Sequence, residues 1–382
     1  MAIKLPAKAK VVVVGGGVIG CSVAYHLTKL GWSDVLLLEK EQLTSGTTWH
    51  AAGLIVSGLL DDETSADIFT YSRNLYSTLE EETGLATGFK SIGYLQIACD
   101  TERLEEMRRS AAFMRNFGID CHEIGLEEAR SHWPNAKWDD VIGAFYTAED
   151  GRANPVDVTM SLAKGFRQRG GTLVEGVRVT DVLEQQGQVT AVVTDHGTVE
   201  TQFVVNCAGM WARQFGELAG VSLPLQAAEH YYLITEDMPG MTPTTPVLED
   251  PDRYAYFREE VGGMMIGLFE PEAAPWNLDR IPDDFSFGEI DPDWERMIPF
   301  LESAYERVPE AKNLGIRKFF CGPESFTPDL APLVGEAPEL RNYFVACGMN
   351  SLGILSGGGI GRILAHWIVN GQPDVDVTGI NV

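Results

Sequence analysis

One stretch near the N-terminus constrains the fold more than any other. Residues 11–14 form a continuous apolar run, as a parallel strand buried on both faces requires. Glycines in G-x-G-x-x-G spacing follow at Gly15, Gly17 and Gly20. Residues 18–30 then carry apolar side chains at helical spacing, and residues 35–38 are a second apolar run that ends in Glu39. The order strand, glycine turn, helix, strand predicts the first unit of a parallel α/β sheet.

Each residue of this motif has an expected task. Gly15 permits the tight turn, Gly17 lets a pyrophosphate approach the backbone, and Gly20 lets the helix pack closely on the strand. The helix N-terminus offers free N–H groups and a positive dipole end to phosphates. Glu39 is placed to accept hydrogen bonds from ribose hydroxyls. The stretch therefore predicts a dinucleotide site, with a purely structural glycine turn as the alternative.

Three later segments are also glycine-bearing. Residues 44–54 form a small-residue loop that holds one Trp and one His, for which an ordinary turn with a surface histidine is the alternative. Residues 204–209 are a strand that turns at glycine, and 348–354 are a tight loop. A helix is expected over 357–369, beginning in a glycine run, so that its positive N-terminus points at a ligand.

The remaining segments predict a second domain inserted into the first. Helices are expected over 102–117 and 294–307, and strands over 229–235, 254–258 and 263–269. Residues 172–203 are expected to form a β-meander, residues 321–329 a rigid loop, and Gly335 a turn. The fold class is α/β in an α+β composite: a Rossmann-like nucleotide domain over 1–90, 150–225 and 320–382, and a mainly antiparallel-sheet substrate domain over 91–149 and 226–319.

Charge and cysteine usage exclude several classes of function. The formal net charge of −26 argues against nucleic acid or an anionic membrane surface as a partner. No apolar run approaches the roughly 18 residues of a membrane span, and the first strand follows too soon for a signal peptide. The six cysteines include no C-x-x-C pair, which predicts a reduced, cytoplasmic protein without a metal site.

Several motifs together resemble the D-amino-acid-oxidase-like flavoenzyme superfamily along the whole chain. They are the N-terminal glycine motif, SGTTWHAAGL at 45–54, DGRANP at 150–155, GPESFTPD at 322–329 and GMNSLGI at 348–354. Within the superfamily the chain is most similar to the flavin domains of dimethylglycine and sarcosine dehydrogenases and dimethylglycine oxidase. Members of that group usually continue into a folate-binding domain. The sequence ends at Val382 without one, as a natural short form or a fragment, so folate coupling is not assumed.

The resemblance implies FAD as the cofactor and a covalent link through His50, with Cys321 as a rival anchor. Together with the glycine-bearing segments it predicts a set of cofactor-binding residues. They are Gly15, Gly17, Gly20, Glu39, Lys40, Ser45, Thr47, Thr48, His50, Gly53, Leu54, Val179, Ala208, Gly209, Trp211, Gly348, Asn350, Ser351, Gly353 and Ile354.

The resemblance further implies oxidative demethylation of an N-methylated amino acid such as dimethylglycine or sarcosine, with His230 and Tyr256 as catalytic residues. Histidine titrates near neutrality and suits removal of the proton from a substrate amine. Oxygen or an electron-transfer flavoprotein is the expected electron acceptor. The alternatives are an oxidase of another secondary or tertiary amino acid, and a flavin-bearing regulatory protein similar to the regulatory subunit of pyruvate dehydrogenase phosphatase. A third alternative, an NAD(P)H-dependent flavin enzyme, is less favoured because no second G-x-G-x-x-G motif is found for a nicotinamide nucleotide.

Overall fold

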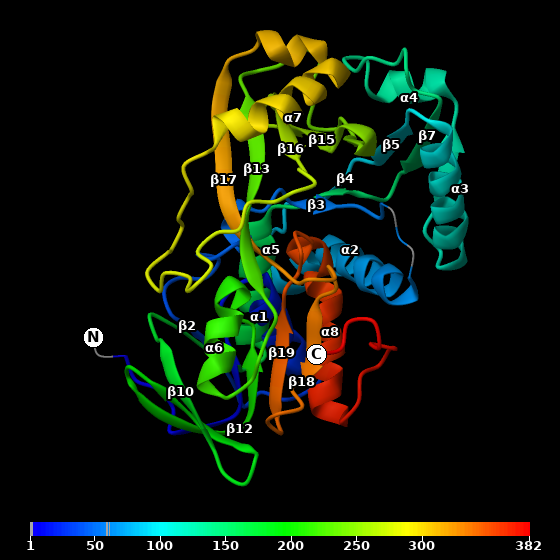
Figure 1. Cartoon of the computed structure of the whole chain (residues 1–382). Coiled ribbons are helices and arrows are strands. Elements are labelled where there is room, and N and C mark those ends of the chain that lie inside the picture. The colour runs from blue at the N-terminus through cyan, green and yellow to red at the C-terminus, as the bar shows by residue number, and fades with distance from the viewer. Residues whose placement is uncertain (1–2, 59, 61) are drawn as a thin grey trace.

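The computed structural model describes residues 3–58, 60 and 62–382, and two large sheets dominate it (Figure 1). The first sheet has five parallel strands at its centre. Their order is β9 (Thr172–Glu175), β2 (Val35–Glu39), β1 (Lys8–Val14), β12 (Gly197–Asn206) and β19 (Tyr343–Cys347). The antiparallel strand β18 (Leu333–Glu336) extends it beyond β19. The expected α/β class with a parallel nucleotide-type sheet is therefore confirmed.

Two expectations for this sheet were wrong. Residues 172–174 do not belong to the meander: β9 pairs in parallel with β2 at the far edge, and the meander consists of β10 (Val179–Glu184), β11 (Val189–Thr194) and the start of β12. Gly335 is not a turn but a residue of β18, with φ +143°. In both cases pairing with a neighbouring strand outweighs the local glycine signal.

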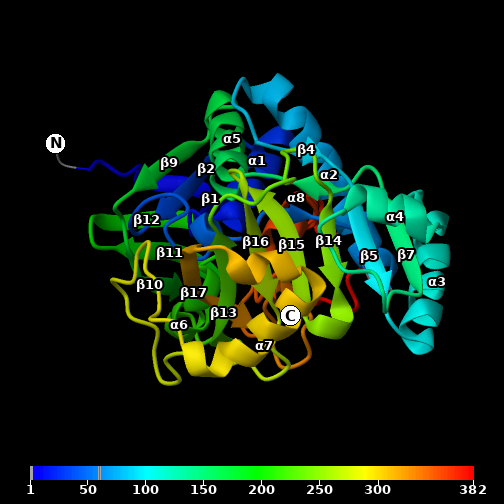
Figure 2. The ribbon, with the colours of Figure 1, turned by 90° about the horizontal axis from the view of Figure 1, so that it is seen from above.

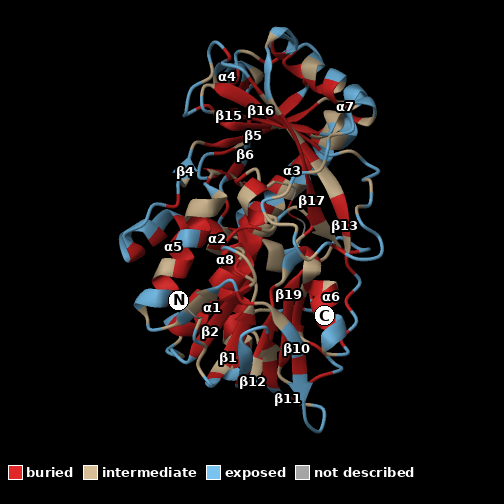
Figure 3. Ribbon diagram, turned by 90° about the vertical axis from the view of Figure 1, so that its left-hand side faces the viewer, coloured by how far each residue is buried: buried red, intermediate tan, exposed pale blue. Residues whose placement is uncertain are grey.

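Three helices form a layer against one face of the first sheet: α1 (Val18–Lys29), α5 (Pro155–Gln168) and α8 (Gly353–Asn370). Helix α2 (Glu63–Thr83) packs on α8 and α5, and Figure 3 shows many buried residues in these helices and in the strands. The short α6 (Ala212–Leu218) packs with β10 and β12 in a separate core. The expected start of α8 was wrong, because the helix begins at Gly353. Its glycines at 357–359 lie inside it, where added Cβ atoms would meet α2 and Val18 at 2.6–3.0 Å.

The second sheet has eight strands and lies above the first in Figure 1. Its order is β17 (Ile316–Phe326), β13 (Gln226–Thr235), β16 (Gly263–Leu268), β15 (Ala255–Glu260), β14 (Val247–Asp250), β5 (Tyr94–Ala98), β7 (Gly143–Thr147) and β6 (Cys121–Ile124). Helix α7 (Trp294–Arg307) covers one face, as seen from above in Figure 2, and α3 (Thr101–Asn116) and α4 (Leu126–His132) flank the far edge.

The expected loop over 321–329 was wrong in its first part. Residues up to Phe326 belong to β17, which pairs along its length with β13. The expected domain boundary at 320 therefore falls inside a strand. Every strand of the first sheet lies in a range assigned to the nucleotide domain, while the domain boundaries themselves stay a prediction.

A small sheet lies where the chain passes between the two large ones. It consists of β3 (Leu54–Ile55), β8 (Gly151–Arg152) and β4 (Lys90–Ser91). The buried Asp150 beside it accepts hydrogen bonds from the Ser57 N–H, the Ser57 hydroxyl at 3.0 Å and Arg73 at 3.1 Å. None of the described helices is both long and apolar enough to cross a membrane.

Candidate active site

Two adjoining cavities, each of about 170 Å³, lie between the two large sheets. The first, here the dinucleotide cavity, follows the carboxyl ends of β1 and β2. Of the predicted cofactor-binding residues it is lined by Gly15, Gly17, Glu39, Lys40, Ser45, Thr47, Thr48, Ala208, Gly209, Trp211, Asn350, Ser351, Gly353 and Ile354. Segments far apart in the sequence thus meet at one place.

The glycine turn is shaped by close backbone contact. Gly15 has φ +114° and donates its N–H to the Leu38 carbonyl at 2.9 Å, and a Cβ on it would lie 2.3 Å from the Cys207 oxygen. A Cβ on Gly20 would lie 2.0 Å from the Gly15 oxygen. Gly20 does not line the cavity and acts through the packing of α1 on β1. Both positions require glycine for steric reasons.

Gly17 differs from the other two. It is the N-cap of α1 and lines the cavity, and a Cβ there would meet only the Thr48 hydroxyl oxygen, at 3.1 Å. That hydroxyl accepts the Val18 N–H at 3.1 Å, so a side chain from the following loop caps α1. The space beside Gly17 is therefore open to the cavity. A phosphate group bound at a helix N-terminus needs such a space.

The acidic end of β2 and the residue after it complete this side. A carboxylate oxygen of Glu39 accepts the Gly16 N–H at 2.6 Å, and burial raises the pKa of Glu39. The Lys40 ammonium lies 3.6 Å from the centre of the Trp211 ring, and burial lowers the pKa of Lys40 to about 8. Val179 lies apart from the dinucleotide cavity, in a neighbouring hollow that Gly15, Lys40 and Trp211 also line.

The C-terminal loop forms the opposite wall. The Asn350 carbonyl oxygen accepts the Thr327 N–H at 2.8 Å, and its amide donates to the Gly348 carbonyl at 2.7 Å. Gly348 itself does not line the cavity among the described residues; an added Cβ would meet Thr327 and Leu225. Helix α8 begins at Gly353 without a side-chain cap, and its first residues, Gly353 and Ile354, line the dinucleotide cavity. The interaction of this N-terminus with an anionic edge of a ligand stays a prediction.

His50 is buried, at 5% exposure, between aromatic rings. Its ring centre lies 5.0 Å from that of Phe320 and 5.5 Å from that of Trp49. Burial lowers the pKa of His50 to about 4, and its Nε2 has no hydrogen-bond partner among the described residues. A neutral ring with an unpartnered nitrogen in the cavity wall is a nucleophilic group without a structural use.

Cys321 is placed differently. It follows Phe320, which lines the second cavity, so its side chain lies on the other face of β17 and packs in the core below α7. Burial raises the pKa of the Cys321 thiol to about 12. The geometry favours His50 over Cys321 as a covalent anchor.

The second cavity, here the substrate cavity, has the second sheet as its wall. It is lined by His50, Ala51, Ala52, Gly53, Leu54, Val56, Gly58, Phe69, Tyr94, His230, Tyr232, Glu249, Tyr256, Phe269, Phe320, Glu324, Ser351, Leu352, Ile354 and Leu355. His230 and Tyr256, predicted from the sequence, therefore face the same space as His50. Both pack on Phe269, with ring centres at 4.9 and 5.6 Å.

A row of directly paired residues crosses this wall. Strand pairing places Phe320, Tyr232, Gly267, Tyr256, Glu249 and Gln96 side by side on six neighbouring strands. Paired residues point to the same face of a sheet. Gly267 leaves the space that the Tyr256 ring fills, since a Cβ there would lie 1.8 Å from the ring carbon Cζ.

The two cavities share Ala51, Glu324, Ser351 and Ile354. A cofactor that extends from the glycine turn through this junction would bring its far end beside His50. The unpartnered His50 nitrogen, the open position at Gly17 and the free N-terminus of α8 fit a dinucleotide with a large ring system.

Several lining residues were missed by sequence analysis. Glu324 belongs to a motif that the sequence does show, but its side chain was not assigned a role. Tyr232, Phe269 and Glu249 carry no motif, and only the register of the second sheet brings them to the cavity.

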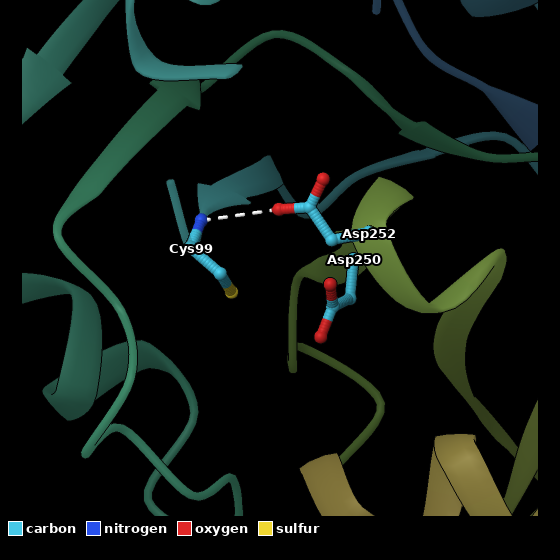
Figure 4. Close-up of side chains that lie close together, drawn as sticks. All are labelled: Cys99, Asp250 and Asp252. Carbon is cyan, nitrogen blue, oxygen red and sulfur yellow. Dashed lines mark hydrogen bonds between the residues drawn. The ribbon is translucent and has the colours of Figure 1, made fainter. Parts of the chain in front are cut away.

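One group of potential metal ligands occurs within the described residues, formed by Cys99, Asp250 and Asp252 (Figure 4). Arginines already neutralise it: Arg307 donates to Asp250 at 2.7 Å and to the Cys99 sulfur at 3.2 Å, and Arg103 donates to Asp252 at 3.1 Å. Cations bound in this way repel a metal ion, so we read the cluster as an ion-pair network behind the second sheet.

Comparison with known proteins agrees with this geometry. Residues 10–367 match the family model described as FAD dependent oxidoreductase, DAO. The chain is 41% identical to human sarcosine dehydrogenase over 99% of its length. It is also 39% identical to 4-methylaminobutanoate oxidase of Paenarthrobacter nicotinovorans over 99%, and 38% identical to the mouse regulatory subunit of pyruvate dehydrogenase phosphatase over 98%.

These alignments cover 41%, 46% and 43% of the three relatives, so the chain spans less than half the length of each. Among solved structures, L-proline dehydrogenase from P. horikoshii is 27% identical and superposes with a TM-score of 0.87 over 98% of this chain and 96% of that one. The sequence resemblance is thereby confirmed. The chain belongs to the DAO family of FAD-dependent oxidoreductases.

Proposed function

We propose that the protein catalyses oxidative demethylation of a small N-methylated amino acid. The observation that carries the proposal is the placement of His230, Tyr256 and Glu249 in one aromatic cavity that adjoins the dinucleotide cavity. Support comes from relatives whose names include sarcosine dehydrogenase and 4-methylaminobutanoate oxidase. The substrate class is what these two names share.

In the proposed reaction a C–H bond of the N-methyl group breaks and hydrogen leaves with both bonding electrons. The nitrogen lone pair forms the new C=N bond, and water then converts the iminium to formaldehyde and the demethylated amine. The glycine turn, Glu39 and the C-terminal loop would hold FAD, which would supply the hydride acceptor.

The chain's own residues prepare the substrate. The nitrogen lone pair is available only after the ammonium proton has left, and the His230 imidazole is the group that we assign to accept it. The Tyr256 hydroxyl holds the substrate carboxylate or relays this proton. Tyr232, Phe269 and Phe320 exclude water, which strengthens each of these polar contacts.

Anaerobic mixing of the flavin-loaded protein with dimethylglycine, sarcosine and 4-methylaminobutanoate tests the function. We expect at least one amine to bleach the flavin absorbance and release one formaldehyde per flavin reduced. We propose oxygen or an electron-transfer flavoprotein as the electron acceptor. Adding each in turn to the reduced protein and following reoxidation of the flavin would identify which one acts. Flavin that stays oxidised with all three amines contradicts the proposed reaction.

We also propose that His50 carries a covalent bond to the flavin. Its unpartnered Nε2, its burial and its place at the junction support this. Acid-precipitated protein should stay yellow, and the peptide containing His50 should carry the added flavin mass. Release of all flavin into the supernatant, or an adduct on Cys321, would overturn the assignment.

The alternative function is a flavin-bearing regulatory protein. The similarity to the regulatory subunit of pyruvate dehydrogenase phosphatase favours it, because that relative covers as much of the chain as the dehydrogenases do. The same anaerobic experiment separates the two: a regulatory protein would bind flavin and leave it oxidised with every amine.

A further inference from the structure

Glu249 is a carboxyl group in a wall that is otherwise mostly aromatic. It lies on β14 between Tyr256 on β15 and Gln96 on β5, in the row that crosses the second sheet. Gln96 donates its amide N–H to Glu249 Oε2 at 3.3 Å, which is the one hydrogen bond that the carboxylate makes with the described residues. Glu249 keeps some accessible surface, and that surface faces the substrate cavity.

The neighbouring Asp250 shows what Glu249 lacks. Asp250 points to the other side of β14, where Arg307 donates to it at 2.7 Å and Arg253 at 3.2 Å. Burial and the nearby Asp250 charge raise the pKa of the Glu249 carboxyl to about 7. A cation arriving in the cavity would therefore hold Glu249 in its ionised form.

No lysine or arginine is available to do so among the described residues that line the substrate cavity, whose titratable groups besides tyrosines are His50, His230, Glu249 and Glu324. Glu324 accepts a hydrogen bond from the Ser351 hydroxyl and lies at the junction of the two cavities, whereas Glu249 lies in the substrate cavity alone. A buried carboxyl without a cationic partner costs stability, which is typical of a group kept for a ligand.

We propose that Glu249 recognises the cationic nitrogen of the ligand, an inference that rests on the proposed function for the identity of that ligand as an amine. The Glu249 carboxylate attracts the bound ammonium. It also stabilises the positive charge that remains on nitrogen when hydride leaves the methyl carbon, so that it acts on binding and on the reaction. The site should therefore bind cationic amines more tightly than uncharged compounds of the same shape.

A pair of ligands that differ only in charge tests this. Trimethylglycine carries a fixed cationic nitrogen, and 3,3-dimethylbutanoate has carbon in its place. Trimethylglycine has no nitrogen lone pair, so binding can be measured without turnover, by the change in absorbance of the flavin-loaded protein. Because the quaternary nitrogen has no N–H, Glu249 can attract it by charge alone, and we expect the wild type to prefer trimethylglycine by roughly tenfold, as for ~1.4 kcal/mol.

Glu249→Gln keeps the shape and the contact with Gln96 but removes the charge. We expect it to bind both compounds with nearly equal affinity, with flavin content and affinity for 3,3-dimethylbutanoate unchanged. Glu249→Asp should keep a preference for the cation. Glu302→Gln, which removes the same charge from the exposed face of α7, is the matched control and should behave as the wild type.

Three results would overturn the proposal. They are an unchanged preference in Glu249→Gln, loss of the preference in Glu324→Gln instead, and a wild type that binds neither compound or binds both equally. Failure of the proposed function is distinguishable, because in that case the charge preference persists while no N-methyl amine reduces the flavin.

Discussion

The dinucleotide cavity and the substrate cavity share a junction but are built by different means. The first is shaped by backbone: Gly15 and Gly20 sit where a Cβ would collide with carbonyl oxygens, and Gly17 leaves open space at a helix N-terminus. The second is shaped by side chains that stand in a row across paired strands. The comparison teaches that the first site should fail when an atom is added, and the second when a particular polar atom is removed.

The largest effect is expected on the backbone-shaped side. Gly17→Val places a branched side chain where the phosphates would lie, and we expect flavin content to fall to nearly zero while the protein still folds, since the added Cβ meets only Thr48 at 3.1 Å. Flavin absorbance after purification measures it. Gly125→Val is the matched control, because Gly125 is also an N-cap glycine, on α4, with open space around it. A fully loaded Gly17→Val protein would contradict the placement.

Removing polar atoms tests the other side. His230→Ala and Tyr256→Phe should each slow flavin reduction at saturating amine by roughly 10²–10⁴-fold, the usual range for loss of a proton-transfer group, with flavin content unchanged. Stopped-flow absorbance gives the limiting rate. His122→Ala, an exposed histidine on β6 of the same sheet, should reduce at the wild-type rate. Wild-type rates and substrate affinity in both cavity variants would place the reaction elsewhere.

A third change adds an atom in the substrate cavity, at a glycine of the second sheet. In Gly267→Ala the new Cβ would overlap the Tyr256 ring, so that ring must leave its position. We expect a loss of substrate affinity of roughly tenfold, as for a change of 1.4 kcal/mol, with full flavin content. The double variant Gly267→Ala/Tyr256→Ala should be no worse than Tyr256→Ala alone, because alanine at position 256 has no ring for the new Cβ to displace. A strictly additive loss would show that the two residues act independently.

The smallest effect concerns stability. The pKa of Glu249 is raised to about 7 from an ordinary value of 4.5, so the folded protein binds more protons than the unfolded chain between these values, and the free energy of unfolding falls as pH rises through this window. Glu249→Gln removes this penalty. Its thermal midpoint should exceed that of the wild type by several degrees at pH 8, and by less at pH 5.5. An equal gap at both pH values would rule out this carboxyl as the cause.

The same contrast explains what the sequence could predict. The spacing of Gly15, Gly17 and Gly20, and the acidic residue at the end of β2, are local signals, and the structure brings these segments to one cavity. His230 and Tyr256 were assigned through a family resemblance, whereas Glu249 could not be found because its position depends on pairing between β14 and β15. A local signal also gave a wrong prediction. The Gly-Pro pair at 322–323 suggested a loop, yet these residues belong to β17 and pair with β13.

The interleaving of the two sheets along the chain has a consequence for synthesis. In the first sheet β12 pairs with β1, which begins at Lys8, and with β19, which ends at Cys347. In the second sheet β5, which begins at Tyr94, pairs with β14, which ends at Asp250. As the chain is made from its N-terminus, neither sheet can be completed until nearly all of it is available. Such long-range pairing slows folding. A chain cut after β16 would lack β17, β18 and β19. It should leave β13 of the second sheet and the end of β12 in the first sheet without their neighbouring strands, so we expect a late truncation to prevent both sheets from forming completely.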